Sequence, residues 1–199
     1  MKGYTSGKNK HHVLVQVIIY TILVFIIFIA VGMPIFQSQY IYPGFLKQIV
    51  ENTENQAIRT GQHLTRNVLG DYSDGQLALS EEMKIGISYT GKDYNLWKIK
   101  IFSKSGVTIY STSEEDIGVI NKRSYFHDIV AEGEIYTKLV KKNTKSLEGQ
   151  VVTSDVVETY IPIMSKGSFV GAFELYYNIT ASKESMDNLV YRYNVILHT

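Results

Sequence analysis

Hydrophobic and polar positions divide the chain into one long apolar run and a longer segment of mixed pattern. The run covers 13–36, which is 24 residues without a formal charge. At about 1.5 Å per residue, a helix of this length measures roughly 36 Å and can cross a hydrocarbon core of about 30 Å. We therefore predict a transmembrane helix at 13–36.

Charged residues on either side of this run predict its orientation. Lys2, Lys8 and Lys10 precede the run, and no acidic residue occurs before Glu51. The positive-inside rule then places the stub 1–12 in the cytoplasm and the rest of the chain outside. A cleaved signal peptide is the alternative, but its apolar region has only about 7–15 residues and ends at a small-residue site. The length of the run therefore favours an uncleaved anchor.

Beyond the membrane, the apolar positions indicate first a helix and then a sheet. In 37–70 they recur near intervals of four, which predicts a stalk that is also the N-terminal helix of a domain. Loop and a short helix follow in 71–90, and the period then changes to two, which is typical of strands. Strands are predicted at 95–102, 107–111, 135–140, 151–163 and 169–177, with further helices at 124–131 and 181–193.

These elements predict an α+β domain with a five-stranded, mostly antiparallel sheet, preceded by one transmembrane helix. The sensor-like core with its C-terminal helix would occupy 71–193. The last residues, 194–199, would be the start of a missing second membrane segment or a tail.

Three segments carry a resemblance to a known family: IKIFSKSGVTIYSTSEEDIG, NKRSYFHDIVAEG and VVETYIPIMSKGSFVGAFELYYNIT. Their order and spacing after a membrane helix resemble the single-Cache, PAS-like extracytoplasmic sensor domains of bacterial receptors. The most similar are those of membrane histidine kinases and diguanylate cyclases, over about 38–193. The resemblance implies a homodimer whose sensor is flanked by two membrane helices and followed by a cytoplasmic transmitter, as in two-component systems.

The sequence departs from that pattern after Tyr193. Only a short tail remains, and no kinase phospho-acceptor helix, nucleotide box or cyclase Gly-Gly signature occurs. The chain is therefore either the input half of a longer receptor or a truncated relative without output. In both cases we expect it to catalyse nothing.

Strand alternation predicts a charged face on the sheet. If the last hairpin turns about Lys166, Ile163 pairs with Phe169 and Glu158 lies opposite Glu174. Two carboxylates directly opposite one another repel and require a cation between them. In the strand order that the resemblance implies, the strand with Lys98 and Lys100 is the neighbour that supplies it. Tyr160 and Tyr176 would share this face, and the other face would carry Trp97, Ile99, Ile101, Phe169 and Phe173.

Two interpretations of the charged face remain open. In the first, it lines a ligand pocket in which an amine or a cation satisfies the acids. In the second, it is a surface salt-bridge ladder, in which each exposed pair contributes about 0–1 kcal/mol.

Arg123, Tyr125 and Phe126 form a second candidate site. They resemble the Arg-x-aromatic-aromatic element with which Cache sensors often bind a ligand carboxylate. An Arg fork binds a carboxylate through two hydrogen bonds, and an aromatic neighbour excludes water. Tyr125 stands where amino-acid-sensing relatives tend to have Trp, which argues against an amino acid as ligand. Alternatively, the two aromatic residues are the buried side of a short helix.

Tyr110, Tyr136 and Lys138 lie on strands that would border the same pocket. The candidate ligand-binding residues are therefore Lys98, Tyr110, Arg123, Tyr125, Tyr136, Lys138, Glu158, Tyr160 and Glu174.

Composition excludes several other functions. With 20 Lys+Arg against 19 Asp+Glu, the chain lacks the basic excess of a nucleic-acid binder. It has no cysteine, and His63 and His127 each stand alone, so we predict no metal site and no cofactor. The acidic run 113–116 lacks a spaced set of oxygen ligands for calcium and is expected to be a solvated loop.

The sequence thus predicts a small-molecule sensor domain outside the inner membrane of a bacterium, with a carboxylate or an amine as ligand. Binding would move the terminal helices and signal to a kinase or a diguanylate cyclase. The alternative is a structural membrane protein whose PAS-like domain serves dimerisation without a ligand.

Overall fold

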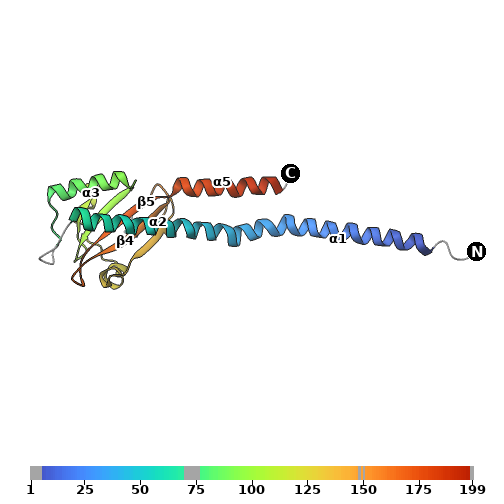
Figure 1. Cartoon of the computed structure of the whole chain (residues 1–199), viewed down its shortest axis with the longest axis horizontal. Coiled ribbons are helices and arrows are strands. Elements are labelled where there is room, and N and C mark those ends of the chain that lie inside the picture. Colours follow the sequence, from blue (N-terminus) through green and yellow to red (C-terminus); the bar gives the residue numbers. More distant parts are fainter. Residues whose placement is uncertain (1–5, 70–76, 148, 150, 198–199) are drawn as a thin grey trace, which may run out of the picture. The chain divides into compact units, whose positions relative to one another are not determined.

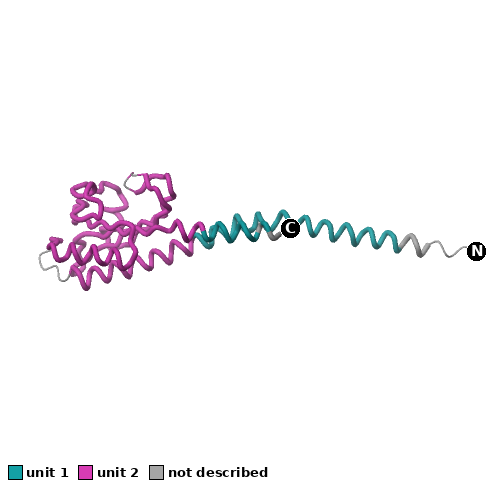
Figure 2. The backbone as a smooth tube through the Cα atoms, turned by 90° about the horizontal axis from the view of Figure 1, so that it is seen from above, with its two compact units in different colours: residues 1–46, 185–199 teal, residues 47–184 magenta. Residues whose placement is uncertain are grey.

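The computed structural model of the chain describes residues 6–69, 77–147, 149 and 151–197. The chain forms two compact units, residues 1–46 with 185–199 and residues 47–184 (Figure 2). Gly70, the predicted end of the stalk helix, lies outside the described residues.

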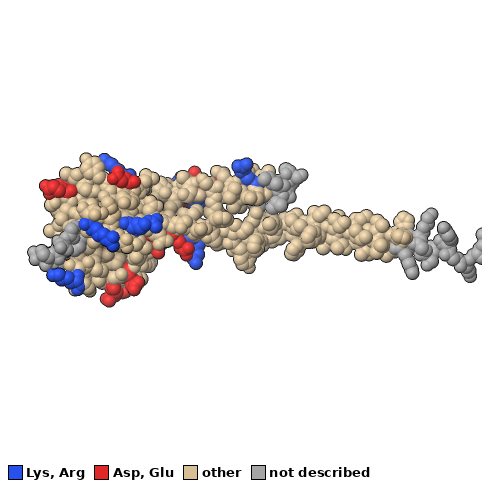
Figure 3. Space-filling view, in the orientation of Figure 1, with Lys and Arg blue, Asp and Glu red and all other residues tan. Residues whose placement is uncertain are grey.

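The N-terminal unit contains helix α1 (Ser6–Phe36), the π-helical segment η1 (Gln37–Ile41) and the start of helix α2 (Tyr42–Leu64). Large apolar side chains of α1 are exposed, from 41% at Ile29 to 72% at Phe28. The run 13–36 within this helix has no charged residue, and the tan part of the helix in Figure 3 accordingly shows no blue or red. Among the described residues, one continuous helical segment, His11–Leu69, is long and apolar enough to cross a membrane, and it contains the uncharged run 13–36.

The second unit is an antiparallel sheet with helices (Figure 1). The strand order is β2-β1-β5-β4-β3, and every pair of neighbours is antiparallel. The strands are β1 (Lys98–Ser103), β2 (Thr108–Ser111), β3 (Tyr136–Val140), β4 (Val156–Ser165) and β5 (Ser168–Asn178). The helices of this part are the end of α2, η2 (Thr65–Leu69), α3 (Glu81–Asp93), η3 (Glu114–Asp116), α4 (Ser124–Asp128), η4 (Val130–Glu132) and the start of α5 (Thr180–Leu197).

The predicted fold class is therefore confirmed: the chain is α+β, with a long N-terminal helix and a five-stranded antiparallel sheet. Among the strand boundaries, the largest difference from the prediction is at β4. The strand expected from Val151 begins only at Val156, and Val151 instead forms an isolated bridge with Lys145.

Each face of the sheet has its own buried cluster. Ile99, Ile101, Phe173 and Leu175 pack with Ala57 and Leu64 of α2 and with Ile87 of α3 on one face, here called the apolar face. The opposite face carries a smaller aromatic cluster of Phe102, Phe126, Val130, Leu147, Tyr160, Phe169 and Ala172. The period-two pattern of β1 produces this division, because successive side chains of a strand point to opposite faces.

The register of the β4–β5 hairpin differs from the prediction. Ser165 pairs with Ser168 across a two-residue Lys166-Gly167 turn, in which both residues have positive φ, 48° and 79°. This is the geometry of the tight hairpin turns that suit twisted strands. A bulge between Ile163 and Met164 then shifts the pairing again.

Two predictions are wrong because of this turn and bulge. Glu158 pairs with Tyr176, and Glu174 pairs with Tyr160, so the two carboxylates are not directly opposite. Phe169, expected on the apolar face, packs instead in the aromatic cluster. Trp97 also differs from the prediction, since it is 44% exposed and its ring lies edge-on against Tyr176.

Asp155 connects the start of β4 to the start of α5. Its carboxylate accepts hydrogen bonds from Lys183 Nζ at 3.0 Å and from the Lys142 backbone N–H at 3.1 Å. Its own backbone N–H donates to Thr180 Oγ1, and its carbonyl accepts from Ile179. Burial of the carboxyl raises its pKa, but these bonds and the nearby lysine charges outweigh burial, and the net pKa lies below its ordinary value.

This lowered pKa predicts an acid-dependent loss of stability. A carboxylate with a depressed folded-state pKa stabilises the protein above its unfolded pKa of about 4, and the contribution is lost as pH falls through the folded value. We expect Asp155→Asn to cost about 2 kcal/mol at pH 7. The difference from wild type should shrink as pH falls from about 4 toward 3.

Urea unfolding followed by the fluorescence of Trp97, the one tryptophan of the chain, measures this difference. Asp128→Asn, at an exposed acid on α4, is the control and should track wild type throughout. A cost of Asp155→Asn that stays constant from pH 7 to pH 3 would contradict the prediction.

Candidate functional site

Cross-strand pairing aligns polar side chains in two rows on the face opposite the apolar face. The first row runs across all five strands and consists of Ser111, Lys100, Glu174, Tyr160 and Tyr136. The second row crosses four strands and consists of Lys98, Tyr176, Glu158 and Lys138. Side chains directly opposite on neighbouring strands have Cβ atoms about 4.5–5.5 Å apart, so neighbouring members of a row are placed close enough to interact.

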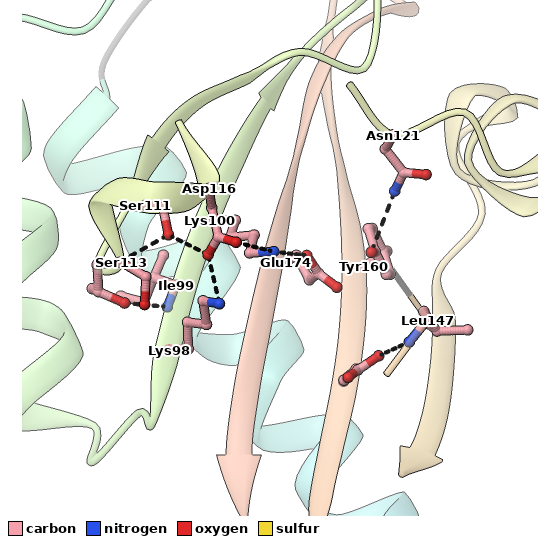
Figure 4. Close-up of polar contacts among 12 residues, drawn as sticks. Lys98, Ile99, Lys100, Ser111, Ser113, Asp116, Asn121, Leu147, Tyr160 and Glu174 are labelled. Carbon is pink, nitrogen blue, oxygen red and sulfur yellow. Dashed lines mark hydrogen bonds and ion pairs between the residues drawn. The ribbon is translucent and has the colours of Figure 1, made fainter. Parts of the chain in front are cut away.

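One end of these rows is a network of buried ion pairs around Asp116. The Asp116 carboxylate lies 2.5 Å from Lys98 Nζ and 3.3 Å from Lys100 Nζ, and it accepts a hydrogen bond from Ser111 Oγ at 3.1 Å (Figure 4). Lys100 Nζ is also 4.0 Å from a carboxylate oxygen of Glu174. The ring of Tyr176 lies 5.7 Å from each ammonium, within cation–π range.

These charged groups are removed from water almost completely. The side chains of Lys100, Asp116 and Glu174 are 1%, 3% and 0% exposed, and that of Lys98 is 11% exposed. Glu158, also 0% exposed, accepts a hydrogen bond from the Leu147 backbone N–H at 3.1 Å. Together these five side chains are called the buried charge cluster.

The other end of the rows is a group of hydroxyls and aromatic rings. The amide of Asn121 donates to the hydroxyls of Tyr125 and Tyr160, both at 3.3 Å, and the two hydroxyls are 3.2 Å apart. Tyr125 stacks on Tyr136 with ring centroids 4.7 Å apart. The backbone N–H of Arg123 donates to the Asn121 side-chain oxygen, so Asn121 also fixes the start of α4.

The structure brings most of the sequence-predicted candidates together. Lys98, Glu158, Tyr160, Glu174, Tyr136 and Lys138 all lie in the two rows, and Tyr125 contacts two of them. Glu174 lies beside Lys100 as the strand order implied, and Lys138 is exposed beside Glu158.

Two candidates lie apart from this group. Tyr110 pairs with Ile101 and packs against the cluster on the apolar face. Burial there raises the pKa of its phenol. Arg123 is the N-cap residue immediately before α4, and it is exposed.

The acidic run Ser113–Asp116 corrects one prediction and adds a residue. Glu114 and Glu115 are exposed as expected of a solvated loop, but Asp116 is 3% exposed and joins the charge network. Asn121 and Ser111 were also missed, because neither their type nor their spacing distinguishes them from ordinary turn and strand residues. The sequence held one signal for a nearby carboxylate. Two lysines at alternate positions of one strand point to the same face, and if that face is buried their charges need a negative partner.

A surface cleft of about 370 Å³ lies between the end of α3 and β1, on the side of the apolar face. Its lining includes Ser88, Lys92, Asn95, Leu96 and Thr112. Most of these side chains are exposed, in contrast to the buried charge cluster.

No protein-family model matches the sequence, and no curated protein matches it. Among solved structures, the sensor domain of E. coli DcuS is 13% identical, covering 69% of this chain and 97% of that one, with a TM-score of 0.49. The sensory domain of the Campylobacter jejuni chemoreceptor Tlp3 with isoleucine bound is 12% identical, covering 77% of this chain and 62% of that one (TM-score 0.48).

The sensor domain of the V. cholerae histidine kinase DctB is 15% identical, covering 73% of this chain and 59% of that one, with a TM-score of 0.47. The chain thus spans about three fifths of the length of the Tlp3 and DctB structures. All three of these solved structures are sensor or sensory domains.

Proposed function

We propose that the chain is the small-molecule sensing part of a membrane receptor, with the two polar rows as its ligand-binding side. The buried charge cluster is the observation that carries this proposal. Removing each ion from water costs several kcal/mol, and its pairing seldom yields a net gain. The sheet already has an apolar core on its other face, so the cluster is not needed to build one. Buried, interacting ionisable groups gather at functional sites.

The long apolar helix and the charges that precede it support the topology of such a receptor. The apolar part of α1 would cross the inner membrane of a bacterium, with the lysines of its N-terminal stub in the cytoplasm. The sheet domain would then lie outside, and a homodimer would pass the signal to a kinase or a diguanylate cyclase. The chain itself would bind without catalysing.

The connection from β5 to α5 supplies a route for the signal. β5 carries Glu174 and Tyr176 of the two rows, and α5 begins directly after it, at Thr180. A ligand that favours one of two arrangements of the rows would shift the position of α5 by its differential affinity for the two states.

The assembly function remains the second candidate, and one observation favours it. Phe102, Phe126, Tyr160 and Phe169 fill much of this face with ring-to-ring contacts of 5.4–6.3 Å between centroids. A face filled by its own side chains would serve dimerisation without a ligand.

A thermal-shift screen of the full chain in lipid nanodiscs tests the proposal. The panel consists of small carboxylates, amino acids, amines and divalent cations. A ligand present at 100 times its Kd should add about 2.7 kcal/mol of stability, which raises Tm by several degrees.

The matched variants decide where a ligand binds. Glu158→Gln, at a buried member of the second row, should remove or weaken the shift, whereas Glu132→Gln, at an exposed acid, should preserve it. If no compound on the panel shifts Tm of a folded chain, the assembly function is favoured. A shift that survives Glu158→Gln and Tyr160→Phe would place the ligand away from the rows.

A further inference from the structure

We propose that the Asp116 carboxylate is an internal occupant of an anion site formed by Lys98, Lys100 and Ser111, and that an external carboxylate competes with it for these groups. The inference rests on the proposed sensing function, because it names the ligand chemistry and the moving part of that site. The occupied state would be the resting state of the sensor.

The contacts of Asp116 are those of a bound carboxylate ligand. One oxygen receives Lys98 Nζ at 2.5 Å and Ser111 Oγ at 3.1 Å, and the other receives Lys100 Nζ at 3.3 Å. Both oxygens are therefore bound by charged or hydroxyl donors. Hydrogen bonds of this charge-assisted kind are roughly twice as strong as neutral ones. The site thus has the donors that an external carboxylate would need.

The donors lie on paired strands of the sheet, whereas the acceptor lies in a short turn. Lys98 and Lys100 lie on β1, which pairs with a strand on each side within the sheet, and Ser111 lies on β2. Asp116 instead belongs to the short turn Ser113–Ile117, here called the acidic turn. Ile117 of this turn is 50% exposed, although it is a large apolar residue. The donor set is fixed by the sheet, and the carboxylate is delivered to it by a surface turn.

Backbone hydrogen bonds limit any movement to the acidic turn. On one side the Thr112 N–H donates to the carbonyl of Ile99, and on the other the Gly118 N–H donates to the carbonyl of Thr108. Within the turn, the Asp116 N–H donates to the Ser113 carbonyl and the Ile117 N–H to the Glu114 carbonyl. The Ser113 N–H also donates to Ser111 Oγ, and the Asp116 carbonyl accepts from the Val119 N–H. Release of the Asp116 side chain would therefore loosen the turn while its two ends stay bonded to the edge of the sheet.

Charge balance favours a carboxylate over an amine at this end of the rows. An incoming carboxylate replaces the one that leaves, so the two lysines keep a paired anion. An ammonium would add a third positive charge beside them.

The tethered Asp116 acts at an effective concentration in the mM range or above, so it must weaken the apparent affinity of any external competitor. In the resting state the two lysines contact Asp116, and in the bound state they would contact the external carboxylate. The two states therefore differ in contacts, as a ligand-driven shift requires.

Chemical rescue of Asp116→Ala in the full chain in nanodiscs tests this inference, with sodium acetate as the probe. Sodium chloride at equal ionic strength controls for screening. Acetate should raise Tm of the variant more than chloride does, with half of the effect at a concentration at least ten times lower than in wild type. Glu115→Ala removes one negative charge from the exposed part of the same turn and should respond as wild type does. Adding Lys98→Met to Asp116→Ala should abolish the response to acetate.

Hydrogen exchange supplies an independent readout. At high acetate concentration, amide protons of the acidic turn in wild type should exchange at least several-fold faster, whereas those of β1 should not. Equal effects of acetate and chloride on Asp116→Ala would overturn the inference. If that variant does not fold in chloride, refolding in acetate must recover it, and failure to do so would overturn the inference as well.

The outcomes separate this inference from the proposed function. A panel ligand that binds wild type and Asp116→Ala equally well, with unchanged exchange in the acidic turn, overturns the internal-occupant role and leaves the sensing function standing. Rescue by acetate without any panel ligand for wild type supports the anion site and counts against sensing.

Discussion

Replacing Lys100 by methionine is expected to lower the free energy of unfolding by about 3–5 kcal/mol. The Lys100 ammonium lies 3.3 Å from the Asp116 carboxylate and 4.0 Å from that of Glu174. Methionine occupies a similar volume, so the cost comes from charge and not from a cavity. It arises because two carboxylates that are at most 3% exposed lose a shared cation and cannot regain water.

Urea unfolding of the full chain in detergent, followed by Trp97 fluorescence, measures this cost. Lys104→Met removes the same charge from the exposed β1–β2 turn and should change stability by no more than about 0.5 kcal/mol. The double variant Lys100→Met with Glu174→Gln should recover part of the loss, because one of the two carboxylates that faced the lost ammonium is then neutral. A loss below about 1 kcal/mol for Lys100→Met would show that the buried pairs are not ionised as described.

Gly171→Ala is expected to cost about 3 kcal/mol or more, at the upper end of what overpacking produces. Gly171 pairs with Ser103 of β1 and with Ile163 of β4, in the middle of the sheet. A Cβ at this position would lie 2.3 Å from the backbone oxygen of Phe102. A carbonyl held in the sheet cannot rotate away as a side chain can, so β1 and β5 must separate.

Gly61→Ala is the matched control for this substitution. Its Cβ would meet Ile161 Cδ1 at 2.9 Å, which is also too close, but the obstacle is the end of a flexible side chain. Alanine in the helix also gains about 1 kcal/mol over glycine, so the net change should lie within about 1 kcal/mol of zero. If the two variants unfold at the same urea concentration, the close approach of backbone at Gly171 is not the reason that this position requires glycine.

Both predictions concern the same central region, because Gly171 allows β1 to approach β5 and Lys100 and Glu174 face each other across that pair. Close pairing of the two strands therefore determines whether the buried charge cluster forms. A variant that separates β1 from β5 should also weaken the response of the chain to any ligand of the two rows.

Local pattern in the sequence was sufficient for the elements and the fold class. The uncharged run 13–36 indicated a membrane helix, and the alternation around Lys98 and Lys100 predicted a strand with a charged face. Both signals are local, since they depend on the period of one element and not on its partners. The same periodicity put Glu158, Tyr160 and Glu174 on one face, and that face is the one that carries the two rows.

Only the tertiary structure decided which charges meet. The two-residue turn and the bulge near Met164 moved Glu158 away from Glu174, a shift that alternation does not encode because any even displacement keeps the same face. Asp116 becomes buried because a surface turn folds back onto β1, and Arg123 stays exposed although its motif predicted a ligand contact. Burial of a loop residue depends on contacts distant in sequence. The sequence by itself therefore determined the helices, the strands and most of their faces, and the fold determined the site.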